Sequence, residues 1–356
     1  MNSPFLEMTT LTVSVVILNY NGLRWLPRCL GSLAEQSRIK DVEIIVADNA
    51  STDGSEKLAE EILRSTPIAG RVFHNGGNLG YCEGNNRGAS AAKGKYLFFL
   101  NTDTWLERDC LEKLIERVET ENADSASPMV LDYDDETFQG NGASGFDIFG
   151  YLTNRPQPLR SGRIFGAPGC SLLIKREVFQ ALGGFDSEFF MYADEADLAW
   201  RLTLSGAVTV TVHEARVHHR GAAAANPKGG GTVQELRTNE MVRFYSTRNS
   251  LLVLLKNAQH FLLLLCMTQC AWIALEMIAV LILTRRWSAV HSAYFRAFAD
   301  LWRLRRHVRQ ERRRIRKMRR HGDFWMLRWL RARPGRWVDV EKVLRLGPPK
   351  VDPSKF

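Results

Sequence analysis

The chain has 356 residues, 45% of them hydrophobic and 24% charged, so it can bury a sizeable core and has no compositional bias toward disorder. Its six cysteines form no Cys-x-x-Cys pair and no dense spacing, which excludes the common zinc modules and a disulfide-stabilised fold. The net charge of +9 is uneven, because residues 285–356 hold 22 Lys and Arg against 6 Asp and Glu while the rest is mildly acidic.

The N-terminal part alternates apolar runs with helical patterns. We expect strands at the runs and helices at the periodic stretches between them; the strands are 13–18, 42–47, 71–74 and 96–100, and the helices are 23–34, 55–63 and 86–92. Residues 1–11 precede this pattern as a flexible N-terminus. Alternating strands and helices predict an α/β domain with a mostly parallel sheet and right-handed crossovers.

Three of these strands end in polar side chains. Asn19-Tyr20-Asn21 follows the first strand, Asp48-Asn49 the second, and Asn101-Thr102-Asp103 the run 96–100. In an open α/β sheet, ligands bind beyond the carboxyl ends of the strands, so three polar ends at one edge predict a binding site. Taken singly, each could be an ordinary turn.

The second half carries two further chemical clusters. Three carboxylates in four positions, Asp194, Glu195 and Asp197, lie between strongly apolar flanks, which favours desolvation and the raised pKa that a general base needs. The alternative is a solvated helix start. The second cluster is His218-His219, which follows an expected strand at 208–212. These histidines could have a chemical role, or they could be an ordinary surface pair.

Beyond residue 250 the composition changes. Residues 261–284 form an apolar stretch long enough to cross a bilayer, interrupted by Gln269 and Glu276, and a run of arginines from Arg303 to Arg320 follows with apolar residues at heptad-like spacing. We expect a hydrophobic membrane-associated segment over 251–286 and a basic amphipathic tail over 287–356 that lies on anionic lipid. Nucleic-acid binding is the rival for the arginines, and we do not expect it.

The start of the chain lacks the basic and apolar regions of a signal peptide, so we expect the domain to be cytosolic. Positively charged segments stay on the cytoplasmic side of a membrane, so we expect the tail to be cytosolic as well. The expected location is therefore the cytoplasmic face of the plasma membrane, the bacterial inner membrane. Whether 261–284 spans, re-enters or lies in the membrane plane stays open. A cut near Asn249 is expected to leave a soluble protein that binds its ligand.

Four blocks in order, VSVVILNYNG, VADNASTDGS, NLGYCEGNNRGASAAKGKYLFFLNTDT and GGFDSEFFMYADEADLAWRL, resemble the family 2 glycosyltransferases, and most of all their bacterial rhamnosyltransferase-like branch. The resemblance implies a single GT-A-type catalytic domain over 12–250. It implies an inverting, metal-dependent transfer of a sugar from a dTDP-rhamnose or UDP-sugar type donor to a lipid-linked or polysaccharide acceptor in cell-surface glycan synthesis.

The resemblance also implies roles for individual residues. Asp103 matches the last carboxylate of the metal motif and would hold Mg²⁺ or Mn²⁺ with the donor diphosphate, with His219 as a second ligand. Glu195 aligns with the catalytic base, and Asp194 is the runner-up. The expected donor-binding residues are Asn19, Tyr20, Asp48, Asn78, Gly80, Asn86, Asn101 and Asp103.

Two departures from the family pattern keep a second hypothesis open. Asn101 replaces the first carboxylate of the metal motif, and Asp194-Glu195 inverts the family's Glu-Asp order. Both motivate the alternative of a catalytically weak sugar-nucleotide-binding or scaffold protein of a glycan-assembly complex.

Overall fold

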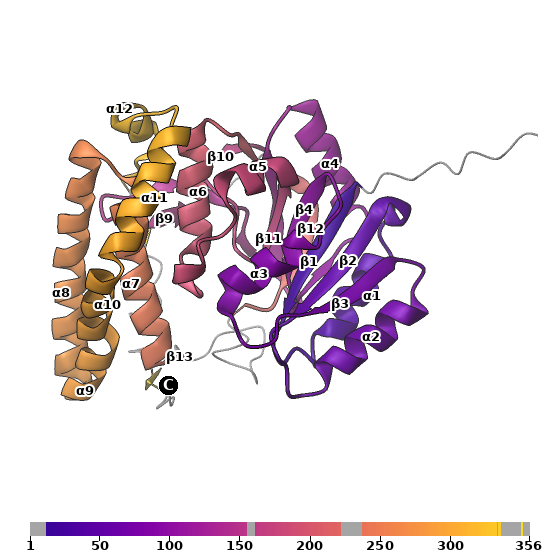
Figure 1. Ribbon diagram of the computed structural model, residues 1–356, viewed down its shortest axis with the longest axis horizontal. Coiled ribbons are helices and arrows are strands. Elements are labelled where there is room, and N and C mark those ends of the chain that lie inside the picture. The colour runs from indigo at the N-terminus through magenta and orange to yellow at the C-terminus, as the bar shows by residue number, and fades with distance from the viewer. Residues whose placement is uncertain (1–11, 155–160, 222–236, 333, 336–349, 352–356) are drawn as a thin grey trace, which may run out of the picture.

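A computed structural model of the chain describes all residues except 1–11, 155–160, 222–236, 333, 336–349 and 352–356, so the expected flexible N-terminus lies outside the described residues. The N-terminal part alternates strands and helices as expected (Figure 1). Its elements are β1 Val13–Asn19, α1 Leu26–Ala34, β2 Val42–Asp48, α2 Ser55–Ser65, β3 Ala69–His74, α3 Gly80–Ser90 and β4 Tyr96–Asn101. The largest difference is in α3, which begins at Gly80, six residues before the expected start.

The second half adds short strands and two longer ones. Its elements are β5 Thr104–Leu106, α4 Cys110–Thr120, β6 Ser125–Asp132, β7 Phe138–Gly140, β8 Ala143–Phe146, β9 Leu152–Asn154, β10 Gly162–Ile164, β11 Ser171–Lys175, α5 Arg176–Leu182, α6 Asp194–Ser205 and β12 Thr209–His219. The strand expected at 208–212 is the first half of β12, which continues to His219.

The central sheet is mixed, not mostly parallel as expected. Its ten strands follow the order β10-β12-β6-β11-β4-β1-β2-β3, with β5 and β7 on the side. The pairings give β1, β2, β3, β4, β6 and β12 one direction, whereas β11 runs antiparallel to both β4 and β6. An apolar run such as Ser171–Lys175 predicts a strand but not its direction. Because six strands still share a direction, their carboxyl ends meet at one edge.

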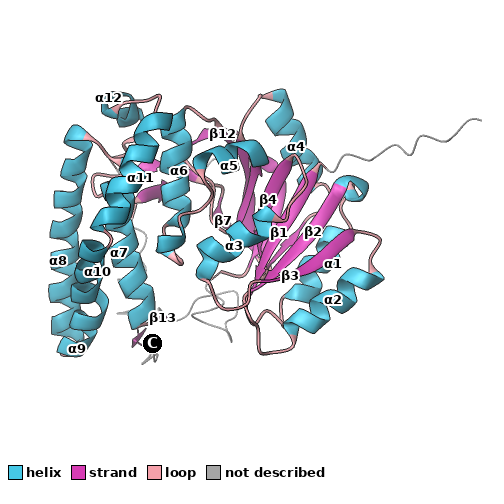
Figure 2. Ribbon diagram, in the orientation of Figure 1, coloured by secondary structure: helices cyan, strands magenta, loops and turns pink. Residues whose placement is uncertain are grey.

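Both faces of the sheet are covered by helices (Figure 2). On one face the apolar side chains of β1 and β2 pack against α1, α2 and α4. On the other face Val16, Ile45, Leu97 and Phe99 pack against α3, α5 and α6, and this core extends to the C-terminal helices. The strands are buried on both sides, which explains why they read as continuous apolar runs.

A group of C-terminal helices packs beside α6, on the side of the molecule away from β3 (Figure 1). They are α7 Glu240–Asn257, α8 Leu264–Thr284, α9 Trp287–Val290, α10 Arg296–Arg303, α11 Arg305–Met318 and α12 Asp323–Met326; two short strands, β13 Arg237–Thr238 and β14 Lys350–Val351, pair with each other. The predicted boundary at residue 250 falls inside α7.

The arginine-rich helix uses its apolar side differently from the expectation. Ile315 is buried, and Leu304, Val308 and Met318 pack against the core that contains α6 and α7. The heptad-like spacing therefore reflects packing within the protein, because this stripe of α11 faces neighbouring helices. The outward side of α11, which is rich in arginine, remains for contacts with other molecules.

A buried network of charges joins α5, α6, α7 and α11. The side chain of Lys256 in α7 is fully buried. Its ammonium contacts the carboxylates of Asp186 and Asp197, the latter at 2.9 Å. Asp197 also bonds Arg201 at 2.8 Å and Asn257 at 2.8 Å, and His307 of α11 bonds Asp186 at 2.8 Å. Burial opposes ionisation of both acids, but these cations outweigh it and hold the pKa of each carboxyl below its ordinary value.

A cut near Asn249 would remove Lys256 and Asn257, so we no longer expect it to leave an intact domain.

Replacing Lys256 by alanine should strongly destabilise the fold. The change leaves two buried carboxylates without their shared cation, and breaking a buried ion pair in this way costs roughly 3–5 kcal/mol. The measurement is urea unfolding at neutral pH. Lys95→Ala is the matched control, because the Lys95–Glu119 pair is about half exposed and such pairs contribute less than about 1 kcal/mol. Equal unfolding free energies for the two variants would contradict the structural role of Lys256.

Candidate functional site

The ends of β1 and β2 form a buried polar cluster. Asn19 Nδ2 lies 2.7 Å from Asp48 Oδ1 and within 3.0 Å of the hydroxyls of Ser51 and Ser55. Asp48 also accepts a hydrogen bond from the Ser51 backbone N–H at 2.9 Å. A Cβ at Gly22 would meet Asn19 Oδ1 at 2.4 Å, so glycine is needed there for Asn19 to keep this orientation. The cluster fixes a carboxylate and an amide at the edge where a ligand would lie.

A second polar group extends the edge toward α3. Asn49 and Asn75 are buried and bond each other at 2.7 Å, and Asn49 Nδ2 donates to the Gly80 carbonyl at 3.1 Å. Asn78 Oδ1 accepts from the Gly80 N–H at 3.1 Å, which closes the turn into α3. Gly80 has φ +76°, and a Cβ there would lie 2.5 Å from the Phe190 carbonyl oxygen. Only glycine permits this approach of two backbones.

Three predicted donor residues have mixed surroundings. Tyr20 is 52% exposed, so its ring is not packed in the core. Asn86 uses both polar atoms of its side chain on the backbone of Phe185, at 2.8 and 2.9 Å, and so braces the loop before α6. Asn101 is half-buried at the end of β4, where its N–H donates to the Cys170 carbonyl.

The predicted metal ligands lie together. His219 Nε2 is 3.6 Å from Asp103 Oδ1, and the other ring nitrogen is 3.3 Å from Gln139 Oε1. Burial disfavours the charged imidazole, but Cys170 and the carboxylates of Asp103 and Asp132 outweigh it and raise the pKa of His219 to about 9. A carboxylate beside an imidazole whose second nitrogen faces an amide oxygen is a donor set that suits a divalent cation.

The predicted catalytic carboxylates begin α6 after an unusual backbone. Phe190, Tyr192 and Ala193 all have positive φ, between 59° and 67°. Burial raises the pKa of Asp194 well above its ordinary value, and the neighbouring Glu195 carboxylate raises it further; burial also raises the pKa of Glu195. Asp197 belongs instead to the buried charge network. Two of the three acids, Asp194 and Glu195, are thus candidates for the general base, and Asp197 is a structural anion.

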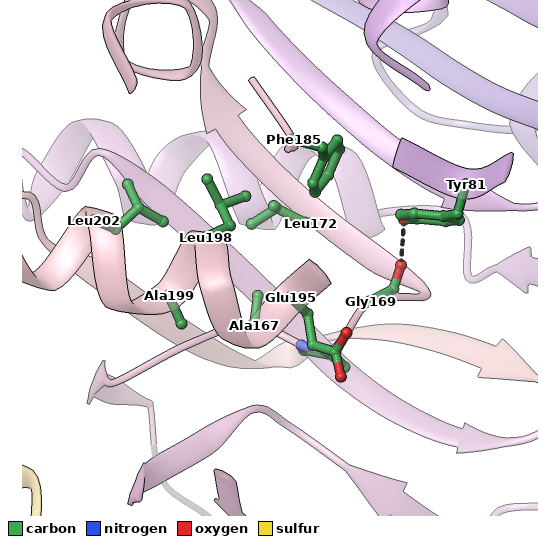
Figure 3. A pocket seen from close by; sticks show the side chains of 10 residues that line it. Tyr81, Ala167, Gly169, Leu172, Phe185, Glu195, Leu198, Ala199 and Leu202 are labelled. Carbon is green, nitrogen blue, oxygen red and sulfur yellow. Dashed lines mark hydrogen bonds between the residues drawn. The ribbon is translucent and has the colours of Figure 1, made fainter. Parts of the chain in front are cut away.

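Glu195 borders a small apolar crevice of about 10 Å³, the space of one water (Figure 3). Its lining is largely apolar, with contributions from Tyr81, Phe185, Leu172, Leu198 and Leu202. The loop 166–170 closes one side, and the Tyr81 hydroxyl bonds the Gly169 carbonyl at 2.7 Å. An atom added at Gly169 would contact Glu195 at 3.7 Å, and Cys170, the next residue, lies beside His219. One loop therefore separates the candidate base from the Asp103–His219 pair.

Some residues of this region were not predicted from the sequence. Asn75 follows β3 directly, the same signal by which Asp48-Asn49 and Asn101 were predicted, and Asn49 was predicted at the edge but given no role of its own. Asn249 of α7 bonds three carbonyls of the segment before α6. No local pattern around residue 249 signals that contact.

A carboxylate–histidine pair and buried carboxylates lie at one edge of the sheet, as the resemblance to the GT-A-type glycosyltransferases implies. The model of the family described as "Glycosyl transferase family 2" matches residues 14–183. This match, over just under half of the chain, confirms the resemblance to the family 2 glycosyltransferases seen in the sequence.

The curated relatives agree with this family. The N-acetylglucosaminyl-diphospho-decaprenol L-rhamnosyltransferase of Mycobacterium tuberculosis is 27% identical over 58% of this chain and 76% of its own length. Glycosyltransferase GlyG of Streptococcus pneumoniae is 28% identical over 35% of this chain and 40% of its own length. The chain thus spans 40% of GlyG, and 30% and 16% of the next two relatives.

Solved structures share the fold. The S. aureus TarS 1–349 structure in complex with UDP has a TM-score of 0.53 and 12% identity, and the match covers 95% of this chain and 92% of that one. The structure of GalNAc-T7 with UDP, GalNAc and Mn²⁺ has a TM-score of 0.50 and 22% identity, covering 58% of this chain and 43% of that one. At these identities the likeness concerns the fold.

Asp194→Asn should stabilise the protein at neutral pH. Because the pKa of Asp194 is raised in the folded state, above about pH 4 the unfolded chain releases this proton more readily, and stability falls as pH rises. The variant keeps the size of the side chain and removes the titration. We expect its Tm to exceed that of wild type at pH 7, by about 1–2 °C per kcal/mol gained in a chain of this length, and to approach the wild-type Tm near about pH 4.

Asp53→Asn is the control of opposite sign. Burial acts against ionisation of Asp53, but hydrogen bonds from Ser55 and Leu23 prevail and lower its pKa, so this acid stabilises the fold above its ordinary pKa. Its variant should melt lower than wild type at pH 7. If the Tm of Asp194→Asn lies below that of wild type at pH 7, by an amount that does not change with pH, the fold does not raise the pKa of Asp194.

Proposed function

We propose that the protein is an inverting, metal-dependent glycosyltransferase of cell-surface glycan synthesis. It moves a sugar from a nucleotide-diphosphate donor, of the dTDP-rhamnose or UDP-sugar type, to a lipid-linked or polysaccharide acceptor. It works at the cytoplasmic face of the plasma membrane of a bacterium.

The observation that carries this proposal is the arrangement around the loop 166–170. Cys170 lies beside the His219 imidazole, which faces Asp103, and Gly169 lies beside the Glu195 carboxylate. A group that neutralises diphosphate and a group that accepts a proton thus border the same loop. Sugar transfer needs both, on opposite sides of the anomeric carbon.

The donor half of the site would bind the nucleotide and its phosphates. Asp48 is held in place by Asn19 and Ser51 and can accept an N–H of a pyrimidine base, while the exposed Tyr20 ring can stack on it. Asp103 and His219 fit a divalent cation, Mg²⁺ or Mn²⁺. When bound, such a cation supplies Lewis-acid neutralisation of the leaving diphosphate.

The acceptor half would supply the base. The hydroxyl oxygen of the acceptor forms a bond to the anomeric carbon, the bond from that carbon to the diphosphate oxygen breaks, and the hydroxyl proton passes to the Glu195 carboxylate. Attack opposite the leaving group inverts the anomeric centre. Burial raises the pKa of Glu195, and a base whose pKa lies nearer neutrality suits this proton transfer. Glu195 is more exposed than Asp194, which supports it as the residue that reaches the acceptor.

Two variants separate the two halves of the proposed reaction. With dTDP-rhamnose and UDP-glucose as probes and Mn²⁺ present, Asp103→Asn should abolish both donor hydrolysis and metal-dependent donor binding. Glu195→Gln should lower turnover by roughly 10²–10⁴-fold while metal-dependent donor binding survives. The measurements are nucleotide release and calorimetric binding, each repeated with EDTA.

The outcomes also test the rival function. Donor binding without turnover in wild type, under every donor and metal tried, would favour the catalytically weak binding or scaffold protein. Full activity of Asp103→Asn would overturn the metal assignment. An active Glu195→Gln beside an inactive Asp194→Asn would move the base to Asp194.

The membrane part of the proposal is supported by α8. Among the described residues one helix, His260–Ile282, is long and apolar enough to cross a membrane, and 17% of its most apolar window is buried. Gln269 and Ile273 face the protein, whereas Met267, Leu275, Ile278 and Ile282 are more than half exposed. Glu276 bonds Arg243 at 2.9 Å and the Tyr294 hydroxyl at 3.0 Å, so its charge does not face outward alone. Because one side of α8 is occupied by protein, we propose that it lies in the membrane plane.

The double variant Leu275→Glu, Ile278→Glu should weaken binding of the full chain to liposomes. The two carboxylates would have to enter the apolar layer of the bilayer, which opposes insertion of this face. The measurement is co-sedimentation with vesicles of neutral or of anionic lipid. Leu23→Glu, just before α1 and likewise exposed, is the control.

Three results distinguish insertion of α8 from a contact through the arginines and from no membrane binding. Loss of binding on both vesicle types supports insertion of α8. Loss that high salt reproduces in wild type would leave only the outward arginines as the contact. Wild-type protein that binds neither vesicle would refute the membrane proposal.

A further inference from the structure

The segment 188–193, which leads directly into Asp194 and Glu195, is held in a strained form. Phe190 has φ 61° and ψ −62°, and Tyr192 and Ala193 have φ 67° and 59°. These are left-handed conformations that side chains with a Cβ rarely adopt, and they persist only where the surroundings impose them. The position of both candidate bases therefore depends on what holds this segment.

One side chain of α7 provides most of that hold. Asn249 is fully buried, and its Nδ2 lies 2.9, 2.7 and 2.8 Å from the carbonyl oxygens of Phe189, Met191 and Tyr192. Three carbonyls of this segment, from residues within four positions of one another, thus converge on one amide nitrogen. A group that only accepts hydrogen bonds could not occupy this place.

Arg248 sets the orientation of that amide. Its Nε donates to Asn249 Oδ1 at 2.8 Å, which fixes Nδ2 toward the segment. The guanidinium also bonds the carbonyls of Glu188 and Phe189, and it pairs with Asp300 of α10 at 2.7 Å. The Phe190 ring stacks on Tyr245 of the same helix, with centroids 5.2 Å apart.

The other side of the segment meets the donor half of the site. The Phe190 carbonyl accepts the N–H groups of Tyr81 at 2.6 Å and Cys82 at 3.2 Å, in the first turn of α3. Those N–H groups would otherwise lack a partner at the start of a helix. The segment is therefore fixed between α3 and α7.

We propose that Asn249, oriented by Arg248, is a positioning residue for the proposed reaction: it holds segment 188–193 so that Asp194 and Glu195 face the acceptor. This inference rests on the proposed function for its kinetic consequence. It assigns a role in the chemistry to a helix that follows the matched family domain by more than fifty residues.

Asn249→Asp tests the proposal with little change of size. The variant removes the N–H donors and sets a carboxylate against three carbonyl oxygens. With dTDP-rhamnose and UDP-glucose as donors, kcat should fall by about 10²-fold, the scale of a small misplacement of catalytic groups. KM for the donor should change less than kcat, because Asn19, Asp48 and Asp103 lie on other elements and only the Asn78–Gly80 turn meets the segment. Amide hydrogen exchange should rise in 188–197 and stay unchanged in β1, β2 and β4.

Ser250→Ala is the matched control, since Ser250 is buried in the same helix and its hydroxyl, within the part of the chain that the structure describes, bonds the Thr247 carbonyl of α7 alone. This variant should have the kcat of wild type and the same amide hydrogen exchange in 188–197. If Asn249→Asp does not fold, Arg248→Lys replaces it: the ammonium can keep Asp300 but cannot also orient Asn249, so the same changes should follow in smaller measure.

Wild-type kcat in the variant, or a loss of kcat matched by faster exchange throughout the sheet, would overturn the proposal. If wild type turns over neither donor, the proposed function fails, and the exchange measurement alone decides. Unchanged exchange in 188–197 would then refute the positioning role.

Discussion

The buried contact of Lys256 with Asp186 and Asp197 is the interaction on which the second half of the molecule depends. The ammonium is fully enclosed and is the cation that the two carboxylates share, while Arg201 also pairs with Asp197 and His307 with Asp186. Around this centre, Arg201 bonds the carbonyls of Leu182 and Gly184, and His307 brings in α11. Four helices from distant parts of the chain are joined by one set of charges. The same set fixes where α6 begins, and so where Asp194 and Glu195 lie.

Electrostatics also separates three acids that are adjacent in sequence. Asp197 has cations on two sides and its pKa is lowered, whereas burial raises the pKa values of Asp194 and Glu195, which pair with no cation of the described residues. The difference comes from Lys256, some sixty residues further on, and from the helical spacing that turns Asp197 toward Arg201. An anion held for structure and a pair held ready to accept a proton can thus occupy one turn of helix. Such division by environment is a common property of catalytic carboxylates.

Much of the donor half could be predicted from the sequence because its signals are local. Apolar runs that end in Asn or Asp at residues 19, 48 and 101 predicted the strands and the edge at which the candidate site lies. The direction of β11 could not be predicted, since it depends on pairing with both β4 and β6. Heptad-like spacing in α11 correctly indicated an amphipathic helix but not its partner, because spacing does not distinguish lipid from α6 and α7. The role of Asn249 was invisible for the same reason: its acceptors are backbone carbonyls, which have no sequence signature.

The two halves of the site meet at a single backbone group, the Phe190 carbonyl. On one side it caps the first turn of α3, beside the Asn78–Gly80 turn; on the other, its residue belongs to the segment that Asn249 holds. A displacement of α7 would therefore reach the donor turn and the base together. The outer side of α7 packs against α8, the helix with the exposed apolar face. If α8 lies in the membrane plane, as we propose, the membrane supports the helix that orients the base. Attachment and catalysis would then share one structural element, and an acceptor embedded in that membrane would be presented to a site already in order.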